Sequence, residues 1–188
     1  ESQPFATSSY SIFVAEVASM TNESLLLDRL LAEERDPTRR VTLLQHAIDD
    51  IAAGFYRQAM FAGFELAAHR EVEADRPITA EVLQRLYLEV LRSFFGSSLD
   101  DQEWYANTWA GIPHFYASPF YVFQYATSKA AAVLLHRRMT EGDEAQRAAT
   151  VARYLELLRA GGSDHPIRPL QRAGVDLGTT EPTEALVA

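Results

Sequence analysis

The chain has 188 residues, of which 47% are hydrophobic and 23% are charged, so it can bury a sizeable core and carries too little charge for a disordered chain. Its formal net charge of -9 leaves no broad basic surface for phosphates, which argues against a nucleic-acid partner, and the lack of cysteine excludes disulfides, thiolate metal ligands and cysteine nucleophiles. No apolar run is long enough to span a membrane and no signal-peptide pattern opens the chain, so we expect one compact domain with no membrane partner. The lack of cysteine also favours a reducing compartment, and we expect the cytoplasm.

Apolar side chains recur every three or four residues over most of the first half of the chain, which is the spacing of amphipathic helices. Serine and threonine are favourable N-caps, whereas an Asp-Pro step and a glycine are natural helix ends. These signals predict three long helices: one from Ser8 or Ser9 to about Glu34, one from Pro37 towards His69, and one from Thr79 to Gly96.

The second half of the chain alternates helical patterns with breaks marked by proline and glycine. We expect a short helix after Asp100, then an irregular stretch 111–114 with His114 in a loop, and then a long helix from Pro119 to Met139. After a turn at 141–143, we expect a helix over 144–160, a short helix bracketed by Pro166 and Pro169, and a polar tail from Gly174. No segment alternates as a β-strand does. The predicted fold class is therefore all-α, with a helical domain over 1–174 and a polar tail over 175–188.

The polar side chains of the first predicted helix gather on one face. Glu16, Ser19 and Glu23 are spaced i, i+3 and i+7 in a segment that is otherwise mostly apolar. A buried carboxylate at Glu16 would lose several kcal/mol of hydration and would need a cation, an arginine or a proton. The pattern leaves two interpretations open: a solvent-exposed face or structural ion pair, and a metal or catalytic site.

Aromatic residues concentrate in one segment of the chain, because nine of the 20 lie between Trp104 and Tyr125. Within it, His114 follows a Gly-Ile-Pro stretch whose exposure would favour function over packing. Histidine and tyrosine side chains together can stabilise an oxyanion that develops near neutral pH. A core cluster with one hydrogen-bonded histidine is the alternative interpretation.

The other histidines give weaker signals. Glu65 and His69 are spaced i, i+4, which is compatible with shared ligation but is more typical of surface groups, and His46, His136 and His165 have no partner at ligand spacing. The sequence contains neither Glu-x-x-His nor His-Glu-x-x-His, so it holds neither the usual di-iron pattern nor a complete zincin site.

The segment from Ile12 to Glu23 resembles the one that follows the zinc-binding helix in oligoendopeptidase F and its relatives, which include thimet oligopeptidase. The spacing of its two glutamates and the serine between them is specific. Three further segments agree with the same family in the same order: 55–61, 112–116 with 120–127, and 161–163 with 174–176. The resemblance therefore spans almost the whole chain.

This resemblance implies a mostly helical, zinc-dependent endopeptidase that hydrolyses internal bonds of short peptides, with Zn²⁺ as its cofactor. Two histidines of a His-Glu-x-x-His helix and one glutamate bind the metal in this family, and Glu16 matches that third ligand. Glu23, with Ser19, matches positions beside the ligands that would orient a zinc-bound histidine. His114 matches a histidine that contacts substrate, and Tyr121 and Tyr125 fall in a tyrosine-rich helix that would hold the peptide and stabilise the oxyanion.

The chain also departs from the family pattern. Phe123 and His165 stand where relatives have tyrosine, and Gly63 stands where a glutamate is expected. The His-Glu-x-x-His helix would lie a short distance upstream of Glu1. We therefore expect the chain to be the C-terminal part of such a peptidase, to bind zinc weakly and to be inactive alone.

A non-catalytic helical module that binds a peptide or a partner through the aromatic segment is the alternative function. A missing helix would leave apolar surface exposed, so a homodimer through that surface is compatible with either interpretation.

Overall fold

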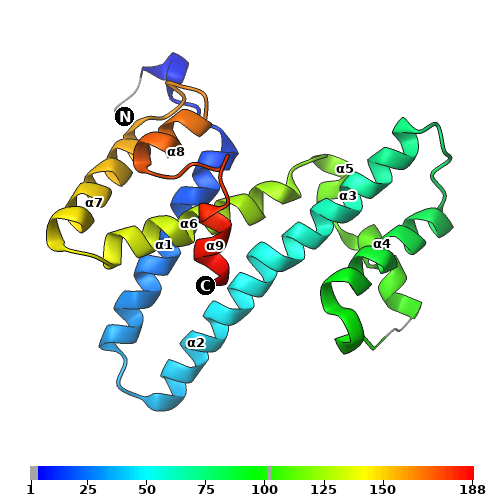
Figure 1. The fold of residues 1–188 in the computed structure, drawn as a ribbon, viewed down its shortest axis with the longest axis horizontal. Coiled ribbons are helices and arrows are strands. Elements are labelled where there is room, and N and C mark those ends of the chain that lie inside the picture. The colour runs from blue at the N-terminus through cyan, green and yellow to red at the C-terminus, as the bar shows by residue number, and fades with distance from the viewer. Residues whose placement is uncertain (1–3, 101–102) are drawn as a thin grey trace. The chain divides into compact units, whose positions relative to one another are not determined.

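The computed structural model describes residues 4–100 and 103–188, and every regular element in these ranges is a helix (Figure 1). The predicted all-α class is confirmed. Residues 1–3, with which the expected domain begins, and residues 101–102, with which the expected short helix begins, lie outside the described part. No helix in the described ranges is both long and apolar enough to cross a membrane.

The α-helices, in chain order, are α1 (Ile12–Glu33), α2 (Pro37–Ile51), α3 (Arg57–Glu73), α4 (Ala80–Phe95), α5 (His114–Ala117), α6 (Val122–Thr140), α7 (Glu144–Arg159), α8 (Ile167–Ala173) and α9 (Glu181–Val187). A π-helical turn, η2 (Ala52–Tyr56), joins α2 to α3. The 3-10 segments are η1 (Phe5–Thr7), η3 (Gly96–Ser98) and η4 (Glu103–Gly111).

Two predicted helices follow their local signals closely. Thr79 caps α4 by accepting a hydrogen bond from the Val82 amide at 3.3 Å, and Gly96 ends it with a φ of 54°. Asp143 caps α7 in a capping box in which Gln146 reciprocates. In both cases the determining contacts lie within one turn, so the sequence is sufficient to predict them.

The start of α1 was predicted too early. Ser8 is not the cap, because its hydroxyl donates to the Phe5 carbonyl at 2.8 Å and closes the 3-10 turn η1. Ser11 caps α1 instead and accepts a hydrogen bond from the Phe13 amide at 3.3 Å. The predicted end near Glu34 is confirmed within one residue.

The single helix expected from Pro37 towards His69 is interrupted by the π-turn η2. A π-turn holds an extra residue per turn, which rotates the face that the following helix presents. Before the turn, Val41 and Ile48 of α2 are exposed, and after it Phe61 and Phe64 of α3 are buried. The apolar stripe therefore does not run unbroken through the segment.

Three further predictions need correction in the C-terminal half. The long helix α6 begins at Val122 and not at Pro119, because Phe120 adopts a left-handed φ of 57°. Helix α8 continues through Pro169 to Ala173 and ends at Gly174, whose φ is 100°. The segment expected as a polar tail contains α9, with Pro182 buried.

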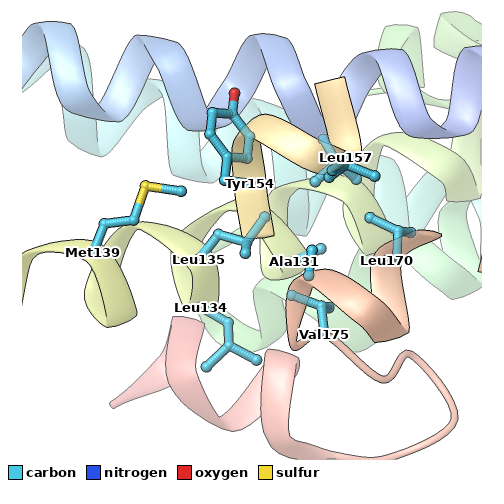
Figure 2. Close-up of a cluster of buried hydrophobic side chains, with 10 residues drawn as sticks. Ala131, Leu134, Leu135, Met139, Tyr154, Leu157, Leu170 and Val175 are labelled. Carbon is cyan, nitrogen blue, oxygen red and sulfur yellow. The ribbon is translucent and has the colours of Figure 1, made fainter. Parts of the chain in front are cut away.

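The chain divides into two compact units: unit 1 comprises 1–51 and 127–188, and unit 2 comprises 52–126. The core of unit 1 is mostly aliphatic and draws on α1, α6, α7 and α8 and the residue after Gly174; its buried members are Val17, Ala131, Leu134, Leu135, Met139, Tyr154, Leu157, Leu170, Ala173 and Val175. Figure 2 shows Tyr154 extending from α7 towards α1, and Leu134 turned towards α9.

The core of unit 2 is aromatic. Phe64 lies at its centre, with ring centroids 5.3 Å from Tyr87, 5.2 Å from Phe115 and 6.3 Å from Trp109. Its buried members are Met60, Phe61, Phe64, Leu86, Tyr87, Leu91 and Val122. Of the nine aromatic residues of the segment 104–125, three pack against this core, Tyr105, Trp109 and Phe115, and four are exposed, so the core-cluster interpretation holds for only part of the segment.

Candidate functional site

The first candidate group lies on α1 in unit 1. Two long-range hydrogen bonds hold the helix on either side of Glu16: the Ser128 hydroxyl of α6 donates to the Phe13 carbonyl at 3.3 Å, and the Tyr154 hydroxyl of α7 donates to the Ala18 carbonyl at 3.1 Å. The next residue, Val17, is fully buried. The backbone that carries Glu16 is therefore fixed against the core of unit 1.

The polar face of α1 is more exposed to solvent than expected for a helix that carries a fully buried carboxylate. Glu16 is half-buried, and Ser19 and Glu23 are exposed. The Ser19 hydroxyl donates to the carbonyl of Glu16 at 3.1 Å, so this bond goes to the backbone and not to the carboxylate. Glu16 lies at the border between the buried stripe of α1 and its open face, where a carboxylate can reach an incoming cation. Its role as a metal ligand stays a prediction.

A pocket of about 380 Å³ lies beside this face in unit 1. Glu23 of α1, His46 and Asp50 of α2, and Lys129 of α6 contribute to its lining. Lys129 is only 4% exposed, and its ammonium group pairs with the Asp50 carboxylate. This buried cation was not predicted from the sequence, although a lysine inside the apolar run of α6 is an unusual feature that could have indicated it.

The histidine of α6 also has a partner that its sequence position did not reveal. His136 Nε2 lies 2.6 Å from the Asp28 Oδ2 atom of α1. The two residues lie on different helices and are 108 positions apart in sequence, so spacing within one helix could not reveal their contact.

Over residues 4–100 and 103–188, no three His, Cys, Asp or Glu side chains are grouped as metal ligands. The donor chemistry of α1 fits one part of a zinc site, since a half-buried carboxylate on a fixed backbone is a suitable ligand for Zn²⁺. A catalytic zinc ion takes three protein ligands, of which Glu16 is the predicted one in this chain.

The second candidate group lies in unit 2 and consists of His114, Tyr121 and Tyr125. The His114 and Tyr121 rings are stacked with centroids 5.3 Å apart and an interplanar angle of 7°. The Tyr125 ring stands edge-on to both, at 5.8 Å from His114 and 4.9 Å from Tyr121. The Tyr125 hydroxyl lies 3.5 Å from His114 Nε2. The structure therefore brings together the three residues that the sequence analysis singled out here.

The backbone around His114 is more regular than predicted. His114 is the first residue of the one-turn helix α5 and does not lie in a loop. The Tyr116 amide donates to the Pro113 carbonyl at 3.1 Å, and the Ser118 amide donates to the His114 carbonyl at 3.0 Å. Pro113 is compatible with this turn because it needs no amide donor at the helix start.

This aromatic group offers hydrogen-bond donors of the kind that stabilise negative charge on oxygen. His114, Tyr121 and Tyr125 are all half-buried, so their polar atoms are partly withdrawn from water and still accessible. Phe123, which departs from the family's tyrosine, is 42% exposed and adds no hydroxyl.

Glu65 and His69 are not the surface groups that their spacing suggested. Glu65 is 4% exposed, and its Oε1 accepts a hydrogen bond from the Phe120 amide at 2.8 Å. His69 Nδ1 lies 2.8 Å from the Glu65 carbonyl, and the His69 ring packs on the Phe120 ring with centroids 4.3 Å apart. Neither residue is a simple surface group, and both contact the turn that precedes α6.

The chain resembles known proteins over nearly its full length. The model of peptidase family M3 matches residues 1–187. The chain is 40% identical to group B oligopeptidase PepB of Streptococcus agalactiae serotype III (strain NEM316), covering 98% of this chain and 30% of that protein. It is also 40% identical to oligopeptidase PepF of Bacillus subtilis (strain 168), covering 97% of this chain and 27% of that protein.

The structure matches the crystal structure of oligoendopeptidase-F from Enterococcus faecium with a TM-score of 0.83 and 36% sequence identity. The match covers 95% of this chain and 33% of that one. The chain thus spans about a third or less of the length of these relatives.

Proposed function

The chain belongs to peptidase family M3, and from this premise we propose that it forms part of the active site of a zinc-dependent oligoendopeptidase that hydrolyses internal bonds of short peptides. The observation that supports the proposal is the mutual ring contact of His114, Tyr121 and Tyr125, the residues to which the sequence resemblance assigns substrate contact and oxyanion stabilisation. The names of the oligopeptidase relatives support the same activity.

Glu16 is the residue of this chain that would bind the zinc ion, and the two histidine ligands would come from a His-Glu-x-x-His helix, which these 188 residues do not contain. The chemistry that zinc supplies in such an enzyme, when bound, is polarisation of the scissile carbonyl and activation of a water molecule. Glu23 and Ser19 would hold a histidine ligand in its orientation through hydrogen bonds, a role that their exposure on the open face of α1 permits.

His114 and the two tyrosines would act on the substrate itself. As the attacked carbonyl becomes tetrahedral, its oxygen gains negative charge, and a donor from Tyr125 or from His114 would stabilise it. The 3.5 Å separation between the Tyr125 hydroxyl and His114 Nε2 keeps both polar atoms close together without fully satisfying either, so both can turn to a substrate oxygen.

The isolated chain, on this proposal, hydrolyses nothing, because one carboxylate cannot form a catalytic zinc site. Chelator-sensitive peptidase activity of the purified 188-residue chain would contradict it. The coding sequence upstream of Glu1 gives a direct check: the proposal requires a His-Glu-x-x-His motif there, and an initiator codon in its place would favour the peptide-binding module.

The decisive activity experiment uses the extended protein, defined as this chain together with that upstream segment. With an internally quenched peptide substrate, His114→Ala and Tyr125→Phe should each lower kcat by roughly 10²- to 10³-fold, the usual loss for an oxyanion donor. Tyr116→Phe is the matched control, since Tyr116 is 62% exposed and lies in the same segment. Unchanged kcat in both His114 and Tyr125 variants would refute the role of this group.

A further inference from the structure

Unit 2 contains a buried carboxylate that the proposed catalytic roles leave unused. Glu65 of α3 is 4% exposed, in a helix whose neighbouring buried residues are the aromatic and aliphatic side chains of the unit 2 core. A carboxylate in such surroundings is costly unless it is hydrogen-bonded. Its Oε1 accepts a hydrogen bond from the backbone amide of Phe120 at 2.8 Å, across 55 positions of sequence.

The amide that Glu65 binds belongs to an unusual backbone position. Phe120 has a φ of 57°, in the left-handed region that bulky residues rarely adopt. Such a conformation persists only where surrounding contacts impose it. Two contacts from α3 do so here, since Glu65 binds the Phe120 amide and the His69 ring packs on the Phe120 ring at 4.3 Å.

The left-handed residue sits directly before the tyrosines of the candidate site. Tyr121 follows it, and the Tyr121 amide donates to the Ser118 carbonyl at 3.1 Å, which closes the turn. Helix α6 begins at the next residue, Val122, and carries Tyr125 one turn later. The direction in which the chain leaves Phe120 therefore determines where the Tyr121 and Tyr125 rings lie relative to His114.

We propose that Glu65 is a positioning residue for the His114–Tyr121–Tyr125 group, acting through its hydrogen bond to the Phe120 amide. The inference rests on the proposed function for the importance of these rings, but the geometry that it concerns can be measured without catalysis. His69 assists by packing on the Phe120 ring, and its Nδ1 lies 2.8 Å from the Glu65 carbonyl, which ties the two residues together.

Two variants distinguish the effect of the length of the Glu65 side chain from the effect of its charge. Glu65→Gln keeps an oxygen at the same distance and removes the charge, whereas Glu65→Asp keeps the charge and withdraws the oxygen by one methylene. NMR of the full 188-residue chain should show the His114–Tyr121 ring contacts retained in Glu65→Gln and lost in Glu65→Asp. Hydrogen exchange of the Phe120 amide should accelerate by roughly tenfold or more in Glu65→Asp, the loss expected for one hydrogen bond to a charged group, and by less in Glu65→Gln, which keeps the oxygen but not the charge. Glu73→Asp, at an exposed position of the same helix, is the control.

Other results would overturn the proposal. Wild-type ring contacts and Phe120 protection in Glu65→Asp would show that Glu65 does not position the group. Loss of the tryptophan fluorescence signal of unit 2 in both Glu65 variants would make Glu65 a general core residue, because both tryptophans, Trp104 and Trp109, lie in this unit.

The extended protein separates this inference from the proposed function. Glu65→Asp should lower kcat at least tenfold with KM within about threefold of wild type. Glu65→Gln should have a kcat close to that of the wild type. If the ring contacts are lost in Glu65→Asp while kcat is unchanged, the catalytic role of the rings fails and the positioning role of Glu65 stands. If the contacts persist, the positioning role fails.

Discussion

The cores of the two units are built from different kinds of side chain. In unit 1, aliphatic residues such as Leu135 and Leu170 come from regular helices. In unit 2, the buried residues also come from α-helices, but aromatic rings centred on Phe64 dominate, and Trp109 of the 3-10 segment η4 packs against them. Both cores join residues far apart in sequence, but in unit 2 a 3-10 segment supplies some of the packed rings.

This difference matters because each unit carries one of the two candidate groups. Glu16 lies on a helix that is fixed by core packing of unit 1, as metal ligands generally are. The His114 group lies where the chain changes direction, next to the left-handed Phe120. We infer that the metal ligand depends on the general stability of unit 1, and that the aromatic group depends on a few specific polar contacts of unit 2.

The largest effect should follow from removing the centre of the aromatic core. Phe64→Ala deletes a ring that is 3% exposed and contacts three other aromatic side chains. We expect a loss of about 3–5 kcal/mol in the free energy of unfolding, measured by tryptophan fluorescence in urea. Phe94→Ala, at a 45% exposed position, is the control. Equal, small losses in the two variants would show that unit 2 is not organised around Phe64.

The corresponding change in unit 1 should cost somewhat less. Leu135→Ala opens a cavity at a fully buried position of α6, with an expected loss of about 2–5 kcal/mol. Hydrogen exchange over α7 and α8 reports the effect, and Leu155→Ala, which is 42% exposed, is the control. Unaltered protection of α7 and α8 in Leu135→Ala would contradict the account of the unit 1 core.

The smallest effect concerns a single hydroxyl and its dependence on pH. The Tyr154 hydroxyl binds the Ala18 carbonyl at 3.1 Å and Asn22 Oδ1 at 3.0 Å, so Tyr154→Phe should lose about 0.5–1.5 kcal/mol near neutral pH. Burial raises the pKa of Tyr154 above its usual value of 10.0, and it likewise raises the pKa of Tyr87 in unit 2.

The sign of the pH effect follows from these raised values. Because the folded state favours the protonated phenol, the stabilisation is fully present below the unfolded pKa and is lost as the pH rises through the folded pKa. The free energy of unfolding should therefore fall above about pH 10, and less steeply in Tyr154→Phe than in the wild type. Parallel pH profiles for the two proteins would exclude Tyr154 as a contributor.

The sequence predicts the parts of the fold whose causes are local. The caps at Thr79 and Asp143 bind amides within their own first turn, and both helices begin as predicted. The left-handed conformation of Phe120 was not predictable in this way, because the glutamate that stabilises it is 55 residues away. The burial of Lys129 similarly depends on Asp50 from another helix.

The same distinction applies to the candidate site. The residue types and spacing were enough to single out Glu16 and the aromatic segment, and the structure shows that His114 and its two tyrosines lie together. The half-buried state of Glu16 and the buried state of Glu65 were not evident from their helical positions. Both result from which neighbouring helices cover α1 and α3, and only the folded chain specifies this.

The zinc content of the extended protein tests the central claim most directly. Measured by elemental mass spectrometry after exhaustive dialysis, the wild-type extended protein should hold one zinc ion per chain, and Glu16→Ala should hold far less, while Glu33→Ala, at an exposed position of the same helix, should match the wild type. Stoichiometric zinc in the Glu16→Ala protein would contradict the assignment of this carboxylate as a metal ligand.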